Sequence, residues 1–125
     1  MRKIIFGILL LASTGVFGAA PTCQLSSSGE AYCSYTGKVR QIYINAGGAI
    51  LFYFDTSYDK AIAEAIGFTP TNTSSAAFLV SDSPDFAKMF YSTALAAQAS
   101  KRDVTIQMRG IVSGRLRFDR IWLAE

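Results

Sequence analysis

The sequence predicts a mainly β protein, a small β-barrel that carries one long helix before its last two strands. The chain has 125 residues, which is enough for one domain. Most of it divides into short runs rich in β-branched and aromatic residues, and these runs are separated by Gly, Ser, Asn and Pro. One segment, residues 83–100, has the start signals and the apolar spacing of a long helix.

Residues 1–19 have the features of a secretory signal peptide. Arg2 and Lys3 precede an apolar run that ends at Phe17, and small residues follow. The run is too short for a bilayer span, so no membrane insertion is expected. The mature domain is then residues 20–125, secreted or periplasmic. Removing two basic residues from twelve leaves ten against nine acidic ones, a net charge of +1, so nucleic acid is not an expected partner.

Both cysteines, Cys23 and Cys33, belong to the predicted mature chain. An exported protein enters an oxidising compartment, which favours a disulfide between them. The segment that separates them has a Ser/Gly turn at its centre. We therefore expect a disulfide across a β-hairpin, where directly opposed residues come close enough to be bridged.

The next elements are strands. Residues 37–44 and 49–54 are rich in β-branched and aromatic side chains, and they flank a Gly-Gly turn, which predicts a second hairpin. An Ala-rich segment, residues 55–66, is long enough for a short helix. Residues 69–75 form a loop, and residues 76–80 supply a short strand.

A final hairpin is expected from residues 103–112 and 115–123, which are joined by Ser113 and Gly114. In its second strand the alternation of apolar residues changes phase near Asp119 and Arg120. Such a slip indicates a bulge or sharp bend, as small barrels have at their corners.

The long helix begins with Ser83 as its N-cap and Pro84 in its first position. A helical projection places a core stripe on one side: Phe86, Met89, Phe90, Thr93, Ala96 and Ala97. The far side holds Tyr91 and Leu95 among alanines, which is too apolar for solvent in so small a domain. We expect this side to form an oligomer or channel surface made of Lys88, Tyr91, Ser92, Leu95 and Ala99.

This order of elements has an OB-fold-like layout. The helical stretch 83–99 and the strand 104–108 that follows it resemble the pore helix and next strand of the B subunits of AB5 toxins, nearest to the pertussis-like and subtilase-cytotoxin group. The resemblance covers residues 37–125 in element order. It implies a homopentamer whose helices line a channel, a toxin A-type partner subunit, and host glycans, often sialylated, as ligands. Cholera-type B subunits differ, because their disulfide joins the N-terminal region to a distant strand.

Sugar binding needs aromatic faces and polar side chains, and the sequence supplies candidates for both. We expect glycan contacts from Tyr43, Asn45, Tyr53, Arg109, Arg117 and Trp122. Two other interpretations stay open. The aromatic residues can belong to the core or to the sheet surface. The arginines of the last hairpin, with Arg115 and Arg120, can form a solvated edge that discourages strand aggregation.

The composition argues against an enzyme. The chain contains no histidine, which excludes Ser-His-Asp and Cys-His nucleophile systems and His-ligated zinc. Asp55, Asp59 and Glu64 are interpreted as solvated acids around a short helix rather than as a calcium or glycosidase site. No metal, cofactor or catalytic residue is expected, and a hydrolase without histidine is the least favoured alternative.

Two functions follow from these patterns. The first is a secreted, oligomeric glycan- or receptor-binding protein of the toxin B-subunit type, a homopentamer that binds host cells. The second is a monomeric periplasmic OB-fold module that binds a small ligand or a protein. In the monomer, Tyr91 and Leu95 should be buried within the subunit or against a tail.

Overall fold

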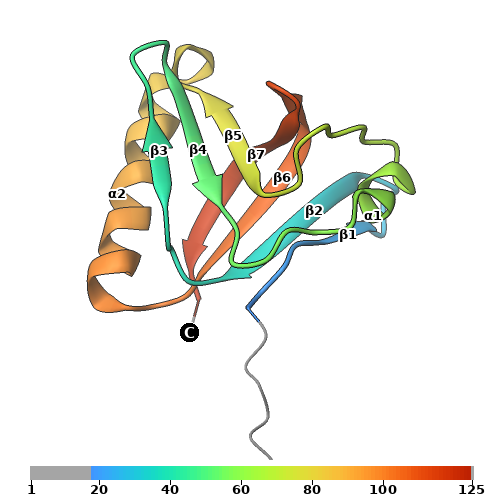
Figure 1. The fold of residues 1–125 in the computed structure, drawn as a ribbon, viewed down its shortest axis with the longest axis horizontal. Coiled ribbons are helices and arrows are strands. Elements are labelled where there is room, and N and C mark those ends of the chain that lie inside the picture. Colours follow the sequence, from blue (N-terminus) through green and yellow to red (C-terminus); the bar gives the residue numbers. More distant parts are fainter. Residues whose placement is uncertain (1–17, 125) are drawn as a thin grey trace, which may run out of the picture.

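A computed structural model describes residues 18–124, so most of the predicted leader lies outside the described residues. The described chain is mainly β, as predicted, with one long helix (Figure 1). The strands are β1 (Thr22–Leu25), β2 (Ala31–Gly37), β3 (Ile42–Ile44), β4 (Ala49–Tyr53), β5 (Ser75–Leu79), β6 (Val104–Val112) and β7 (Arg115–Leu123). The helices are α1 (Lys60–Glu64), the 3-10 turn η1 (Val80–Asp82) and α2 (Pro84–Ser100). None of these helices has the length and apolarity to span a membrane.

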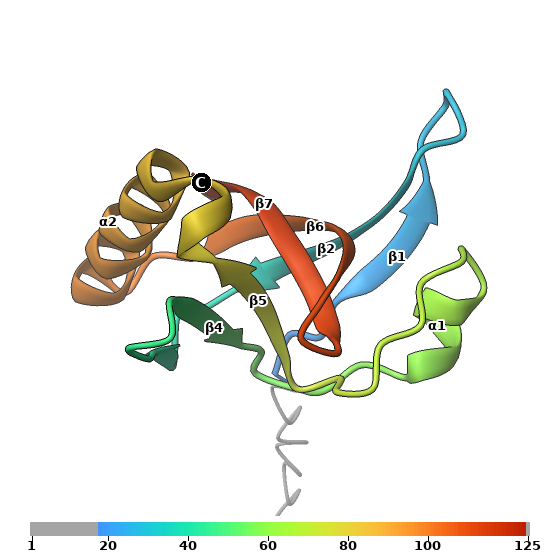
Figure 2. The same ribbon diagram turned by 90° about the horizontal axis from the view of Figure 1, so that it is seen from above.

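All seven strands belong to one mixed sheet, in the order β1-β2-β6-β7-β5-β4-β3. Every neighbouring pair is antiparallel except β5 and β7, which are parallel. The sheet is not closed into a barrel, because its two edge strands, β1 and β3, are not paired with each other. Figure 2 shows α2 on one side of the curved sheet and the β1–β2 hairpin projecting away from it.

Two irregularities in the β6–β7 ladder help to bend the sheet. Gln107 is opposite Arg120 and Met108 is opposite Phe118, which leaves Asp119 without a partner. The predicted change of phase near Asp119 is therefore confirmed. A second irregularity lies before Ile111, where Gly110 has a φ of 76°. An extra residue on one strand increases its local bend and twist.

An aromatic cluster fills the concave side of the sheet. The rings of Phe90, from α2, and Phe118, from β7, are stacked with their centroids 3.9 Å apart. Phe78 stacks on Phe118 from the other side at 5.6 Å. Tyr35 and Phe52 continue the cluster toward β2 and β4, and all of these rings are buried.

The buried stripe of the helix overlaps the predicted one only at Phe90 and Ala97. Its buried residues are Ala87, Phe90, Ala94 and Ala97. Met89 is 62% exposed and Ala96 is exposed too, so their assignment to the core was wrong, and Phe86 and Thr93 are only partly buried. The reason is steric: three alanines let the helix approach the sheet closely, and Phe90, with the partly buried Phe86, packs against the aromatic rings of the sheet.

The ends of α2 follow known capping rules. The Ser83 hydroxyl accepts a hydrogen bond from the Phe86 N–H at 3.3 Å, which confirms the predicted N-cap. At the other end Lys101 has a φ of 57°, and the Arg102 N–H donates to the Ala97 carbonyl at 2.9 Å. This is a Schellman-type ending. Glycine is preferred in the left-handed conformation of Lys101, and a side chain there costs about 1 kcal/mol.

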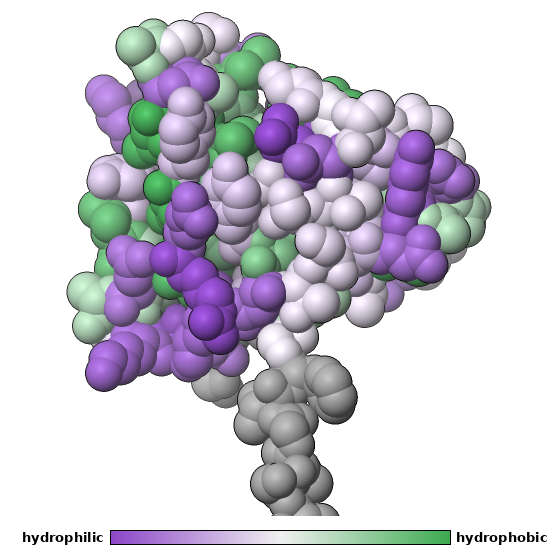
Figure 3. Space-filling model, viewed as in Figure 1, coloured by the Kyte–Doolittle hydropathy of each residue, from purple (hydrophilic) through white to green (hydrophobic). Residues whose placement is uncertain are grey.

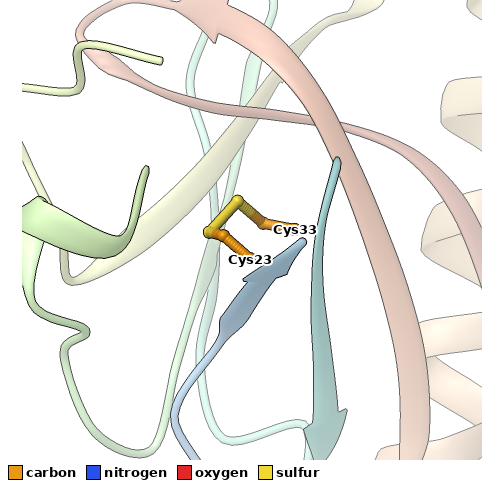
Figure 4. Close-up of a disulfide and its surroundings, with 2 residues drawn as sticks. All are labelled: Cys23 and Cys33. Atoms are coloured by element: carbon orange, nitrogen blue, oxygen red, sulfur yellow. A yellow bond between two sulfur atoms is a disulfide. The ribbon is translucent and has the colours of Figure 1, made fainter. Parts of the chain in front are cut away.

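The predicted disulfide is confirmed. Cys23 and Cys33 are directly opposed on β1 and β2, with their Cα atoms 4.0 Å apart (Figure 4). The Cys33 side chain is buried in the main core. The bridge therefore ties β1 to β2 at a position where β2 packs in the core.

The strand predicted at residues 37–44 is not continuous. β2 ends at Gly37 and β3 begins at Ile42, so residues 38–41 form a bend. Two side chains hold this bend through its carbonyl groups. The Tyr35 hydroxyl donates to the Lys38 carbonyl at 2.9 Å, and the Gln98 amide donates to those of Val39 and Arg40 at 3.5 and 3.3 Å.

Tyr58 supplies a test of the core. Its hydroxyl is buried and lacks a hydrogen-bond partner, and burial raises its pKa from 10.0 to about 12. Tyr58→Phe should therefore increase the free energy of unfolding by about 1 kcal/mol at pH 7, because the unsatisfied hydroxyl is removed.

The raised pKa of Tyr58 also predicts that the free energy of unfolding depends on pH. Because the hydroxyl keeps its proton more tightly in the folded state, stability should fall as the pH rises from 10 toward 12. Denaturant titrations at pH 7 and 11 should show a smaller loss for the Phe variant than for the wild type. An equal loss, or a Phe variant that is less stable at pH 7, would contradict this account.

Candidate functional site

The most distinctive surface lies between the edge strand β3 and the outer side of α2. We call it the α2–β3 face. A groove of about 440 Å³ runs along it. Its walls are Ile42 and Ile44 from β3, Tyr91, Leu95 and Gln98 from α2, and Arg40 and Gln41 from the bend.

This groove exposes large apolar side chains. Ile44 is 49% exposed, Leu95 is 40% exposed and Tyr91 is 37% exposed. Figure 3 shows hydrophobic atoms interleaved with hydrophilic ones over β3 and α2, on the left of the view. Within residues 18–124 nothing covers these side chains, and such a cluster is typical of an interaction surface.

The main chain of β3 offers hydrogen bonds on its open edge. The Asn45 N–H donates to the Ala49 carbonyl at 3.1 Å, and the Gln41 carbonyl accepts from the Tyr53 N–H at 3.1 Å. In an antiparallel pair these groups alternate between the two sides of a strand. The N–H and C=O of Ile42 and Ile44 therefore point away from β4. The α2–β3 face thus combines a free strand edge with an apolar helix surface.

The sequence located the helix side of this surface but not the strand side. Lys88, Tyr91, Ser92, Leu95 and Ala99 are all exposed on α2, and of these Tyr91 and Leu95 line the groove. Ile42 and Ile44 were predicted only as strand residues. The only sequence feature that relates Ile42 and Ile44 to this surface is their position at the end of an apolar run, directly before the turn.

The predicted glycan residues do not form one site. Tyr43, Leu51, Ala77 and Arg117 are successive cross-strand partners on β3, β4, β5 and β7. Tyr43 and Arg117 stand at opposite ends of this row, three strand spacings or about 14 Å apart. Trp122 lies farther along β7, opposite Thr105.

The two remaining polar and aromatic candidates lie at opposite ends of β4. Tyr53 is the last residue of β4, two residues beyond Leu51. Asn45 has a local task, because its side-chain oxygen accepts from the Ala49 N–H at 3.1 Å and so holds the turn. Tyr43, on β3, remains exposed.

Arg109 is committed to contacts within the domain. Its guanidinium pairs with Glu30 at 3.0 Å and with Asp119 at 3.1 Å, and it lies over the Tyr32 ring at 5.1 Å. Its side chain is only 16% exposed. Arg109 therefore joins the β1–β2 hairpin to β6 and β7, and its charge is already balanced.

Other charges of the predicted clusters also serve the fold. The Arg115 guanidinium donates to the buried Ser75 hydroxyl at 2.8 Å. The Arg117 guanidinium lies 5.5 Å from the centre of the Phe78 ring. The last hairpin is therefore not simply a solvated basic edge, since two of its arginines contact residues of β5.

The three acidic residues are placed separately. Asp59 accepts from the Ala61 N–H at 2.9 Å and caps α1, and Glu64 pairs with Lys60 at 3.5 Å. Asp55 pairs with Arg40 and its carboxylate side chain is buried, so its interpretation as a solvated acid was wrong. No group of three potential metal ligands is found among residues 18–124.

Comparison of the chain with protein-family models finds no match, and neither does comparison with curated proteins or with solved structures. The function must therefore be argued from the geometry of the domain itself.

Proposed function

We propose that the protein is a secreted, non-catalytic receptor-binding protein that assembles into a homo-oligomer through its α2–β3 face. The observation that carries the proposal is the exposure of Ile44, Tyr91 and Leu95 in a groove beside the open edge of β3. A second copy would pair with the main chain of Ile42 and Ile44 and cover Tyr91 and Leu95. A strand edge forms a stable interface when its main-chain hydrogen-bonding groups and the neighbouring apolar side chains are buried together.

We propose a ring as the form of the oligomer. In it a different surface of the neighbour meets the α2–β3 face, whereas a two-fold dimer would pair this face with itself. Such head-to-tail contacts close into rings when the rotation between subunits allows it. The proposal is a pentameric ring, following the resemblance of the helix and the strand after it to toxin B subunits.

We also propose that the sheet is a variant of the OB-fold barrel. β2 and β3 would be two halves of one strand that bends at residues 38–41. The first half, β2, pairs with β6, and the second half, β3, pairs with β4. This single strand would therefore pair with both edge strands of the four-stranded sheet β6-β7-β5-β4. The parallel pair β5–β7 and the position of α2 between β5 and β6 support this proposal.

The monomeric alternative is less well supported. A self-sufficient monomer would bury Tyr91 and Leu95 within the subunit. Both side chains are exposed, and no part of residues 18–124 covers them. The observation therefore favours a partner outside the chain.

Host glycans are the proposed ligands of the assembled ring, and a toxin A-type subunit is a proposed partner. Because the candidate residues are dispersed, each subunit would bind a sugar through a small contact area only. This area would be centred on the exposed ring of Tyr43. A ring repeats such a contact, and multivalency raises the overall affinity without new contacts in each subunit.

The absence of catalysis is part of the proposal. Burial and the nearby Asp55 raise the pKa of Tyr35 to about 12, and burial raises that of Tyr58 to about 12. These hydroxyls are protonated at neutral pH with or without the shifts, so the proposal rests on the lack of histidine in the chain.

Leu95→Arg tests the oligomer. Light scattering coupled to gel filtration should give the wild type a mass five times that of the subunit at micromolar concentration, and the variant the mass of one subunit. An arginine would bring an unpaired charge into the apolar contact. Met89→Arg is the matched control, since Met89 is exposed on the same helix but does not line the groove. A monomeric wild type, or equal masses for the two variants, would contradict the proposal.

A glycan array tests the ligand. The wild-type oligomer should bind a subset of sugars, and Tyr43→Ala should weaken that binding at least tenfold, because the loss of one aromatic face recurs in every subunit. Trp122→Ala, an exposed aromatic residue at a distant position, should bind as the wild type does. An array without bound sugars would contradict glycan recognition while leaving the oligomer in place.

A further inference from the structure

A second cavity, of about 300 Å³, lies where α2 ends beside the bend. Four cationic side chains surround it, two from the bend and two from the end of the helix: Lys38, Arg40, Lys101 and Arg102. Val39 and Ala97, both buried, supply apolar parts of its lining. No local sequence pattern predicts this cavity, because 63 positions separate Lys38 from Lys101.

The cavity has a surplus of positive charge. Lys38 pairs with Asp103 at 2.8 Å, and Arg40 pairs with Asp55. Among residues 18–124 no carboxylate pairs with Lys101 or Arg102. The local balance is therefore four cations against two carboxylates, a surplus of two.

The negative end of α2 does not cancel this surplus. The Lys38 ammonium donates to the Lys101 carbonyl at 2.7 Å, beside the last turn of the helix. Because Asp103 already balances the charge of Lys38, the partial charge of about −0.5 at the helix end lowers the surplus from two to about one and a half. An anion in the cavity would therefore meet ammonium and guanidinium groups rather than bare carbonyls.

The conformation of Lys101 is a second, independent observation. Its φ of 57° is one that glycine adopts freely and lysine does not. The left-handed position belongs to the Schellman-type ending of α2, which favours glycine, so the helix end itself does not require a lysine side chain there. Here the lysine adds a charge to the cationic rim at the expense of local backbone stability.

We propose that this cavity binds a tetrahedral oxyanion, the phosphate monoester or sulfate ester of a larger molecule. A phosphate monoester carries between one and two negative charges near pH 7, which matches the surplus. Its oxygens point in several directions, so cations on two separate segments can contact it together. A carboxylate has two oxygens in one plane and is satisfied by a single guanidinium. Apolar lining beside the rim suits the carbon atoms that carry the ester.

Two sources share this chemistry, a sugar ester and a phospholipid headgroup. Calorimetric titration with glucose 6-phosphate and with inorganic sulfate represents the soluble source. Co-sedimentation with vesicles that contain phosphatidic acid represents the lipid source. Saturable binding in either arm supports the site and identifies the source, whereas binding in neither arm at millimolar phosphate or sulfate would overturn it.

The decisive variant is Lys101→Gly. Its unfolding midpoint should rise, because glycine relieves the left-handed conformation, while its affinity for glucose 6-phosphate or for phosphatidic acid vesicles should fall about tenfold or more through loss of a charged contact. Arg120→Gln removes a charge from the exposed surface of β7, away from the cavity, and should bind as the wild type does. Unchanged affinity in Lys101→Gly, or an equal loss in Arg120→Gln, would contradict the site.

This inference does not depend on the oligomer. If Leu95→Arg yields a monomer that still binds the anion, both proposals stand. If the wild type is monomeric but Lys101→Gly loses affinity, only the proposed assembly fails. If the wild type is oligomeric but binds no oxyanion, only the anion site fails.

Discussion

The bend at residues 38–41 determines most of what this domain can do. It carries the chain from β2, which pairs with β6, to β3, which pairs with β4, so one short segment connects distant parts of the sheet. Its carbonyl groups are held by the Tyr35 hydroxyl and the Gln98 amide. These hydrogen bonds are partly buried or exposed, so each is expected to contribute about 1 kcal/mol to holding the bend in place.

Both candidate surfaces follow from this bend. Because Gln98 belongs to α2, the same contact fixes the helix beside β3 and leaves a groove between them. On the other side of the contact, Lys38 and Arg40 face the end of the helix and create the cationic cavity. The core reinforces the arrangement, because the stacked rings of Phe90 and Phe118 hold α2 against the sheet.

Local features of the fold were predictable from the sequence. Ser83 and Pro84 predicted the start of the helix, and Cys23 and Cys33 predicted the disulfide-linked hairpin. The change of phase near Asp119 predicted the bulge. Each of these signals lies within a few residues of the feature it predicts, since capping, turn chemistry and alternation act over short distances.

Features that depend on register between distant segments were missed. Phe90 and Ala97 were placed correctly in the core stripe of α2, but the buried Ala87 and Ala94 were not. Tyr43 and Arg117 were expected in one sugar site, but intervening strands separate them. The cationic cavity combines Lys38 with Lys101, and no local pattern relates two residues so far apart.

The central claim is that a second copy of the chain covers the open edge of β3. Hydrogen exchange of single amides, followed by NMR at a series of protein concentrations, tests it most directly. The Ile44 N–H should gain protection as the concentration rises, because it points away from β4 and would bond to the neighbour. The Asn45 N–H, bonded to the Ala49 carbonyl within the subunit, serves as the internal reference. Fast exchange of the Ile44 amide at every concentration would contradict the claim.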